Sequence, residues 1–239
     1  MVESEIDQLF GGLYASMSDR FWVNSIESIS RANWKIDQLM EASAASLTVP
    51  RTLVTSNAKE ALDFFDECGG KMIYKLLCSH VRRSTNKGRF SGVYTNVVTR
   101  EEIIAREKEI SVAPCLFQEY VNKQFELRVT IIGKSVFTVS IDSQKSPRSA
   151  VDWRRYDTDR TPYSPYQLDS AIERQLLELV KRYGLVFACI DLIVRPDGEV
   201  IFLELNPNGQ WYWLEPLSGI PLTARFAEFL VDHFQSETK

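Results

Sequence analysis

The stretch from Leu185 to Asn208, LVFACIDLIVRPDGEVIFLELNPN, contains two apolar segments on either side of a Pro-Asp-Gly sequence. Asp-Gly between apolar segments is a favoured two-residue loop, so the stretch predicts a β-hairpin with a type I′ turn. A loop at Asp197-Gly198 places Asp191 directly opposite Glu204, with β-carbons about 4.5–5.5 Å apart. Two carboxylates then meet on one face of the hairpin.

A third oxygen-bearing side chain belongs to the same face. Asn206 follows Glu204 by two residues, and side chains two apart along a strand point to the same side. Facing carboxylates repel each other and raise each other's pKa unless a cation lies between them. Hard oxygen ligands suit Mg²⁺, which commonly binds nucleotide phosphates as well, so Asp191, Glu204 and Asn206 are candidate metal ligands. The opposite face of the second strand is expected to carry Ile201, Leu203 and Leu205.

Two other interpretations of the hairpin stay open. Asp191 and Glu204 can be hydrogen-bonded structural acids, or the loop can be longer and put them on opposite faces. Lys75 and Arg128 favour the functional interpretation, because each is a cation among apolar residues and a buried cation needs a partner. Phosphate oxygens would supply one, although such a residue, taken alone, is more often snorkelling or salt-bridged.

The middle of the chain predicts a second hairpin, with strands from Phe125 to Ile132 and from Ser135 to Ile141. Gly133-Lys134 suits a two-residue type II′ turn, which would put Arg128 opposite Val139. Side-chain alternation then places Glu126, Arg128 and Thr130 on a charged face, and Leu127, Val129 and Ile131 on a core face.

Helical and extended segments alternate in the rest of the chain. Apolar residues three to four apart predict a largely helical segment over residues 1–46 and a short helix over 57–67, followed by a strand at 72–77. Residues 78–97 are polar and favour a mobile loop, and residues 142–168 form a long irregular connection. Ser170 with Glu173 predicts a capping box at the start of a helix that Gly184 ends.

Composition excludes several classes of protein. The chain has 239 residues, 44% of them hydrophobic, but no apolar run of the roughly 20 residues that span a bilayer, and it begins with an acidic rather than a basic segment. A cytoplasmic protein without a membrane partner is therefore expected. The net charge of −4 gives no basic stripe for nucleic acid, and two histidines argue against a histidine-dependent hydrolase triad. Reduced thiols are expected at Cys68, Cys78, Cys115 and Cys189.

Several strings in this sequence carry a resemblance to a known superfamily, the ATP-grasp enzymes. FQEYV at 117–121 and FELRVT at 125–130 are similar to the hinge and following strand of the ribosomal-protein glutamate ligase type. The chain resembles more closely the ATP-grasp ligases that cyclise graspetides such as the microviridins, over roughly residues 20–230. That resemblance rests on PCLFQEYV at 114–121, IDSQ at 141–144, DWRRY at 152–156 and ELNPNGQW at 204–211.

The resemblance implies an α+β fold in which two lobes with antiparallel sheets enclose the nucleotide. It implies a domain at 51–239, with a small lobe over about 51–117 and a large lobe over about 118–239. Full-length relatives carry a further N-terminal domain, which is expected to be largely absent here. Residues 1–50 would be its helical remnant.

The resemblance also implies a role for each candidate site residue. Lys75 would hold the α- and β-phosphates of ATP, Lys35 would be an additional nucleotide lysine, and Glu126 would accept hydrogen bonds from the ribose. Arg128 would stabilise the charge that develops as the γ-phosphoryl group moves, and the three hairpin ligands would hold two magnesium ions. The hinge against adenine would consist of Gln118, Glu119, Tyr120 and Val121.

The implied activity is an ADP-forming ligase that makes an acyl phosphate on a peptide carboxylate and joins it to a hydroxyl or amine. Its partner would be a precursor peptide with a leader segment, and a homodimer is implied by the resemblance alone. The alternatives are a ligase that adds amino acids to a protein or small molecule, and an inactive partner that binds nucleotide or leader peptide.

Overall fold

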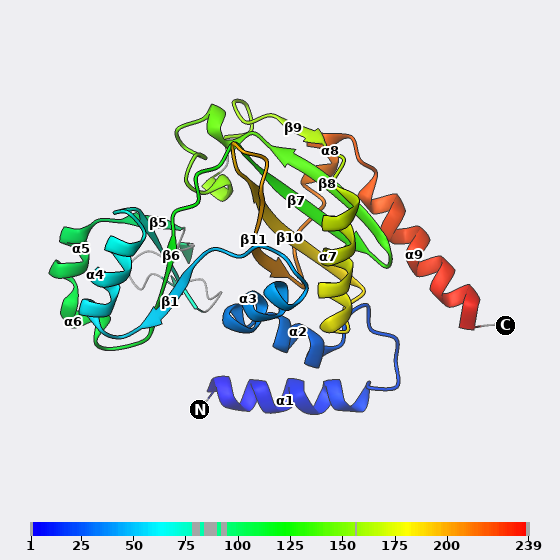
Figure 1. The fold of residues 1–239 in the computed structure, drawn as a ribbon. Helices are drawn as coiled ribbons and strands as arrows, with labels where there is room; N and C mark the ends of the chain where they lie inside the picture. The colour runs from blue at the N-terminus through cyan, green and yellow to red at the C-terminus, as the bar shows by residue number, and fades with distance from the viewer. Residues whose placement is uncertain (1, 78–81, 84–89, 92–94, 156, 238–239) are drawn as a thin grey trace.

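Two antiparallel sheets organise the molecule in the computed structural model, which describes residues 2–77, 82–83, 90–91, 95–155 and 157–237 (Figure 1). Within these residues, a five-stranded sheet has the order β11-β10-β7-β8-β9, a four-stranded sheet has the order β1-β6-β2-β5, and β3 pairs with β4. The expected α+β class is confirmed. The strands are β1 (Thr52–Thr55), β2 (Met72–Lys75), β3 (Arg82–Arg83), β4 (Phe90–Ser91), β5 (Asn96–Val98), β6 (Cys115–Glu119), β7 (Phe125–Ile132), β8 (Ser135–Ile141), β9 (Tyr163–Pro165), β10 (Phe187–Val194) and β11 (Val200–Asn206).

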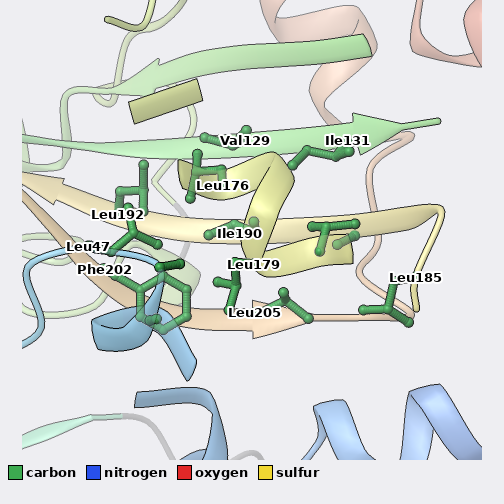
Figure 2. Close-up of a cluster of buried hydrophobic side chains, with 14 of the residues drawn as sticks. Leu47, Val129, Ile131, Leu176, Leu179, Leu185, Ile190, Leu192, Phe202 and Leu205 are labelled. Carbon is green, nitrogen blue, oxygen red and sulfur yellow. The ribbon is translucent and has the colours of Figure 1, made fainter. Parts of the chain in front are cut away.

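The larger sheet buries one face against helices. Figure 2 shows Leu176 and Leu179 of the yellow helix α7 packed over Val129, Ile190 and other apolar side chains of the sheet. Burying such side chains stabilises the fold by about 1.5–3 kcal/mol each. The opposite face of β7, β10 and β11 carries the buried polar side chains of Glu126, Arg128 and Asp191, flanked by smaller apolar clusters. The helical segments are α1 (Val2–Ser16), α2 (Ile26–Ala32), α3 (Lys35–Ala44), α4 (Ala58–Glu67), α5 (Arg100–Ala105), α6 (Glu107–Ile110), η1 (Ser143–Lys145), η2 (Trp153–Arg155), α7 (Ser170–Arg182), α8 (Leu214–Ser218) and α9 (Leu222–Glu237).

The smaller sheet has its own core. Phe64 and Phe65 of α4 and Ile103 of α5 pack with Met72 and Phe117 from the sheet. The predicted helix over 57–67 is confirmed, because Asn57 caps α4 by accepting a hydrogen bond from the Lys59 amide.

The hairpin of β10 and β11 differs from the prediction in its loop. Arg195 N–H donates to the Glu199 carbonyl at 2.9 Å, so Pro196-Asp197-Gly198 forms a three-residue loop and the predicted two-residue turn is wrong. The longer loop alone would move Asp191 out of register. A bulge between Asp191 and Leu192 restores it, and Asp191 pairs with Glu204 as expected.

The bulge also changes which apolar side chains share a face. Ile201 and Leu203 pack around Val121 on the face that carries Asp191, whereas Leu205 packs in the helix-covered core. The prediction that Ile201, Leu203 and Leu205 point the same way is wrong, because the extra residue interrupts the alternation.

Other predictions from the sequence are confirmed or shifted slightly. Arg128 pairs with Val139, as the two-residue turn at Gly133-Lys134 requires. The cap of α7 is Asp169 rather than Ser170, since the Asp169 carboxylate accepts from the Ala171 amide. The helical stretch over residues 1–46 is broken into α1, α2 and α3.

Some expectations concern residues that the structure describes only in part. The predicted loop over 78–97 lies largely outside the described residues, as does Cys78. Of the other cysteines, Cys189 is buried, and Cys68 and Cys115 are half-buried free thiols. Among the described helices, none is both long and apolar enough to cross a membrane.

Candidate active site

The polar face of the larger sheet opens into a cavity of about 290 Å³. Arg128 reaches it from β7, Asp191 from β10, and Glu204 and Asn206 from β11. These are four of the residues that the sequence singled out, and the cavity brings them together. Its remaining lining comes from Asn33, Trp153, Arg154, Pro207, Asn208, Gly209, Gln210 and Trp213.

Arg128 and Asp191 form a buried ion pair across the centre of the sheet. Arg128 Nη1 donates to both carboxylate oxygens of Asp191 at 2.9 Å, and its Nη2 donates to the Gln210 carbonyl at 3.1 Å. Burial raises the pKa of Asp191 to about 6, against the attraction of Arg128 and with the repulsion of Glu204. The pKa of Arg128 stays raised despite its burial, because Asp191 favours the charged form.

Glu204 has a more strongly positive environment than Asp191. Burial favours its neutral form, but Arg154, Lys35 and Lys75 together outweigh burial and lower the pKa of Glu204. Arg154 Nη1 lies 3.8 Å from Glu204 Oε1. Glu204 is therefore ionised at neutral pH and lies close to several cations.

The two carboxylates and Asn206 fit a divalent cation. Asn206 Nδ2 lies 3.3 Å from Asp191 Oδ2 and 3.4 Å from Glu204 Oε1, so both acids converge on one point. Rotating the amide by half a turn would present Asn206 Oδ1 there instead, giving three hard oxygen donors. Among the described residues, no group of three or more His, Cys, Asp or Glu side chains is placed to hold a metal, so the set depends on this amide.

Lys75 lies at the end of β2 in the smaller sheet, and Lys35 is the first residue of α3. Burial lowers the pKa of Lys75 to about 8, while Glu204 raises it and Lys35 lowers it further. Lys35 and Lys75, from different elements, thus both act electrostatically on the Glu204 carboxylate. Such a concentration of positive charge would suit a polyphosphate.

The predicted hinge residues follow one another from β6 into the larger sheet. Gln118 is buried and donates to Thr52 Oγ1 at 2.9 Å, and Glu119 pairs with Arg51 at 3.1 Å. Tyr120 N–H donates to the Lys71 carbonyl, immediately before β2, and Val121 packs against the larger sheet.

Glu126 lies on β7 two residues before Arg128 and is buried. Its Oε1 accepts from Lys123 Nζ at 2.6 Å and from Ser143 Oγ at 2.8 Å. Burial raises the pKa of Glu126 against the opposing effect of Lys123.

Three charged residues in or next to the site were given no role by the sequence. Asp152 and Arg154 form a two-pronged ion pair, with Nε–Oδ1 at 2.9 Å and Nη2–Oδ2 at 2.7 Å. Both lie in the string DWRRY, which gave the resemblance but no role. Lys123 comes from a polar segment between strands, where composition gives no sign of burial.

Comparisons with known proteins identify the fold and family. No protein-family model and no curated protein matches the sequence. The structure is similar to the macrocyclase MdnC of Microcystis aeruginosa, solved with the precursor peptide MdnA, at 33% identity and a TM-score of 0.84 over 97% of this chain and 72% of that one. It is also similar to a Chryseobacterium gregarium RiPP-associated ATP-grasp ligase, solved with ADP and a leader and core peptide, at 27% identity and a TM-score of 0.86 over 97% and 69%.

A third similar structure is the macrocyclase MdnB of Microcystis aeruginosa, at 30% identity and a TM-score of 0.76 over 95% of this chain and 68% of that one. The sheets and helices described above are thus those of ATP-grasp enzymes. The chain belongs to the RiPP-associated ATP-grasp ligases and macrocyclases, enzymes of ribosomally made, post-translationally modified peptides.

Proposed function

We propose that this protein is an ATP- and Mg²⁺-dependent macrocyclase of a ribosomal precursor peptide. It would activate a side-chain carboxylate as an acyl phosphate and join it to a hydroxyl or amine of the same peptide. The observation that carries the proposal is the cavity in which Arg128, Asp191, Glu204 and Asn206 converge. The precursor peptide bound to MdnC, and the leader and core peptide bound to the Chryseobacterium ligase, support a peptide as the substrate.

The site residues divide the work of phosphoryl transfer, which depends on positioning and charge neutralisation. Asp191, Glu204 and Asn206 would hold Mg²⁺, which when bound neutralises phosphate charge. Lys75 and Lys35 would bind the phosphates, and Glu126 with the hinge from Gln118 to Val121 would bind the nucleoside. ADP in the similar Chryseobacterium ligase supports this nucleotide.

The reaction would proceed in two displacements. A carboxylate oxygen of the peptide attacks the γ-phosphorus, the bond to the β-phosphate oxygen breaks, and ADP leaves. A hydroxyl or amine then attacks the acyl carbon, and phosphate leaves with the activated oxygen. Arg128 would stabilise the negative charge on the transferring group. Because the nucleophile gives up its proton and one carboxylate oxygen leaves with phosphate, the peptide loses the elements of one water for each ring.

The test is mass spectrometry of candidate precursor peptides encoded beside the gene, incubated with ATP and Mg²⁺. Loss of one water per ring with formation of ADP is expected. Glu204→Gln should slow the reaction by about 100-fold or more, because it removes a charge that acts in the transition state. Glu199→Gln is the matched control, since Glu199 lies at the loop end of the same hairpin and pairs with Arg195.

Other outcomes would replace the proposal. A gain in mass equal to an amino acid would identify a ligase that adds amino acids. Nucleotide binding by calorimetry without ADP formation, with every candidate peptide, would identify an inactive binding partner. Equal rates for Glu204→Gln and Glu199→Gln would show that the hairpin carboxylates are not the reacting centre.

A further inference from the structure

The strand that carries Glu204 and Asn206 is the outermost strand of its sheet. On its inner side β11 pairs with β10. On its outer side the described residues supply no strand, only an isolated bridge between Thr48 and Ile201, towards the loop end of β11. The pairing is also interrupted by the bulge next to Asp191. A bulge disrupts the ladder locally, so the ladder alone holds Glu204 less firmly than a regular strand would.

Gln38 of α3 occupies the outer edge at this point. Its Oε1 accepts from Leu205 N–H at 2.9 Å, and its Nε2 donates to the Leu205 carbonyl at 2.8 Å. Figure 1 shows α3 lying against the end of the larger sheet, and the two elements are in contact. A side-chain amide thus makes the paired hydrogen bonds that a neighbouring strand would make.

These two bonds hold the peptide groups on either side of Leu205. The N–H of Leu205 belongs to the peptide that joins it to Glu204, and its carbonyl belongs to the peptide that joins it to Asn206. Leu205 itself points into the helix-covered core. Because strand side chains alternate, fixing both peptides fixes the direction in which Glu204 and Asn206 enter the cavity.

The side-chain amide of Gln38 has both an acceptor and donors, and each takes part in a hydrogen bond. Gln38 as a whole residue is 4% exposed, and Nε2 donates a second bond to the Ala32 carbonyl. Only a group with both an acceptor and a donor at this length can satisfy both peptide groups of Leu205. An unsatisfied group at this buried edge would be costly, so the pairing is held firmly.

We propose that Gln38 is a positioning residue that aligns Glu204 and Asn206 for the metal by pairing with the backbone of Leu205. The inference rests on the metal site proposed above. Residues that orient metal ligands typically change metal affinity by about 10–100-fold when they are replaced.

The test measures Mn²⁺ binding in the presence of ADP, from the free Mn²⁺ signal in electron paramagnetic resonance. Gln38→Met keeps the length and buried volume but removes both bonds to Leu205, and it should weaken Mn²⁺ binding by about 10-fold. ADP affinity without metal should be unchanged. Gln175→Met is the matched control, because the Gln175 amide donates to the Ser46 carbonyl rather than pairing with the backbone of Leu205.

Two further variants separate the possible failures. Glu204→Gln should abolish tight Mn²⁺ binding; if it binds Mn²⁺ like the wild type, the proposed metal site itself is wrong. If Glu204→Gln is impaired but Gln38→Met binds normally, only the role of Gln38 is wrong. Should Gln38→Met not fold, Gln38→Asn keeps a shorter amide that reaches one of the two groups, and wild-type Mn²⁺ affinity in that variant would also overturn the role.

Discussion

At the scale of single residues, Asp191 ties the proposed metal site to pH. Burial raises its pKa to about 6, so Asp191 takes up a proton as the pH falls through that value. Metal binding requires the ionised carboxylate, so affinity should be full above about pH 7 and fall by up to about 10-fold per unit below about pH 6. Mn²⁺ titrations with ADP at a series of pH values would measure this.

The control for this prediction is Asp191→Asn, which should bind Mn²⁺ weakly and without that pH dependence. A constant wild-type affinity down to about pH 5 would contradict it. Folding stability should depend on pH in the opposite direction to metal affinity. Because the folded state raises the pKa of Asp191, protonated Asp191 favours folding at low pH, and this contribution is lost as the pH rises through about 6.

Residue-scale prediction worked where local geometry decides. Glu204 and Asn206 are two apart on one strand, so alternation makes their common face readable from spacing. Asp191 faces Glu204 as predicted, but only because the bulge offsets the longer loop. Lys123 was not predictable in this way. Lys123 pairs with Glu126 at 2.6 Å and also donates to the carbonyl of Val151, in the connection between β8 and α7. Its burial depends on this tertiary contact, which the local sequence does not encode.

At the scale of elements, the β10–β11 hairpin shows how two departures from an ideal pattern offset each other. The loop is one residue longer than Asp-Gly suggests, since Gly198 has a φ of +89° and Arg195 closes the loop with Glu199. The bulge then adds one residue to β11. The extra residue is Leu203, which has no partner opposite it on β10. An apolar residue in an apolar strand gives no sequence signal for a bulge.

The loop that follows β11 depends on a glycine for close approach. A β-carbon at Gly209 would lie 2.3 Å from Cys189 Cβ and 2.9 Å from Arg128 Nη2. Gly209→Ala must therefore displace this loop, which supplies the Gln210 carbonyl that Arg128 contacts. We expect peptide modification to slow by about 100-fold, since small misplacements of catalytic groups have effects of this size.

The same rate measurement on Gly12→Ala provides the control for this prediction. A β-carbon at Gly12 in α1 would meet nothing within 4 Å. If Gly209→Ala retained the wild-type rate, the loop would not be needed to hold Arg128 in place.

At the scale of the whole molecule, the sequence predicted the pieces better than their assembly. It predicted a helical segment near the N-terminus but not that α3 would complete the edge of β11, 167 residues further along the chain. Such contacts depend on tertiary packing, which no local pattern of apolar residues encodes. The division into a small lobe over about 51–117 and a large lobe over about 118–239 stays a prediction.

The long connection between β8 and α7 joins the two sheets through Asp152. Its Oδ2 accepts from the Thr95 amide at 3.0 Å, immediately before β5 of the smaller sheet, and its carboxylate pairs with Arg154 beside Glu204. Asp152→Ala would leave the Thr95 amide and Arg154 without this partner. Because Arg154 is 41% exposed and screened by water, we expect a loss of only about 1–3 kcal/mol in unfolding free energy, measured in urea.

The position of the loss distinguishes a link between the sheets from general destabilisation. Hydrogen exchange followed by mass spectrometry should show faster exchange in β5 of Asp152→Ala, while β10 keeps its protection. Asp142→Ala is the matched control, since Asp142 lies in the same connection and pairs only loosely with Lys145, at 3.9 Å. Equal exchange in β5 for the two variants would show that Asp152 does not link the connection to the smaller sheet, and that the hydrogen bond to the Thr95 amide contributes little to the protection of β5.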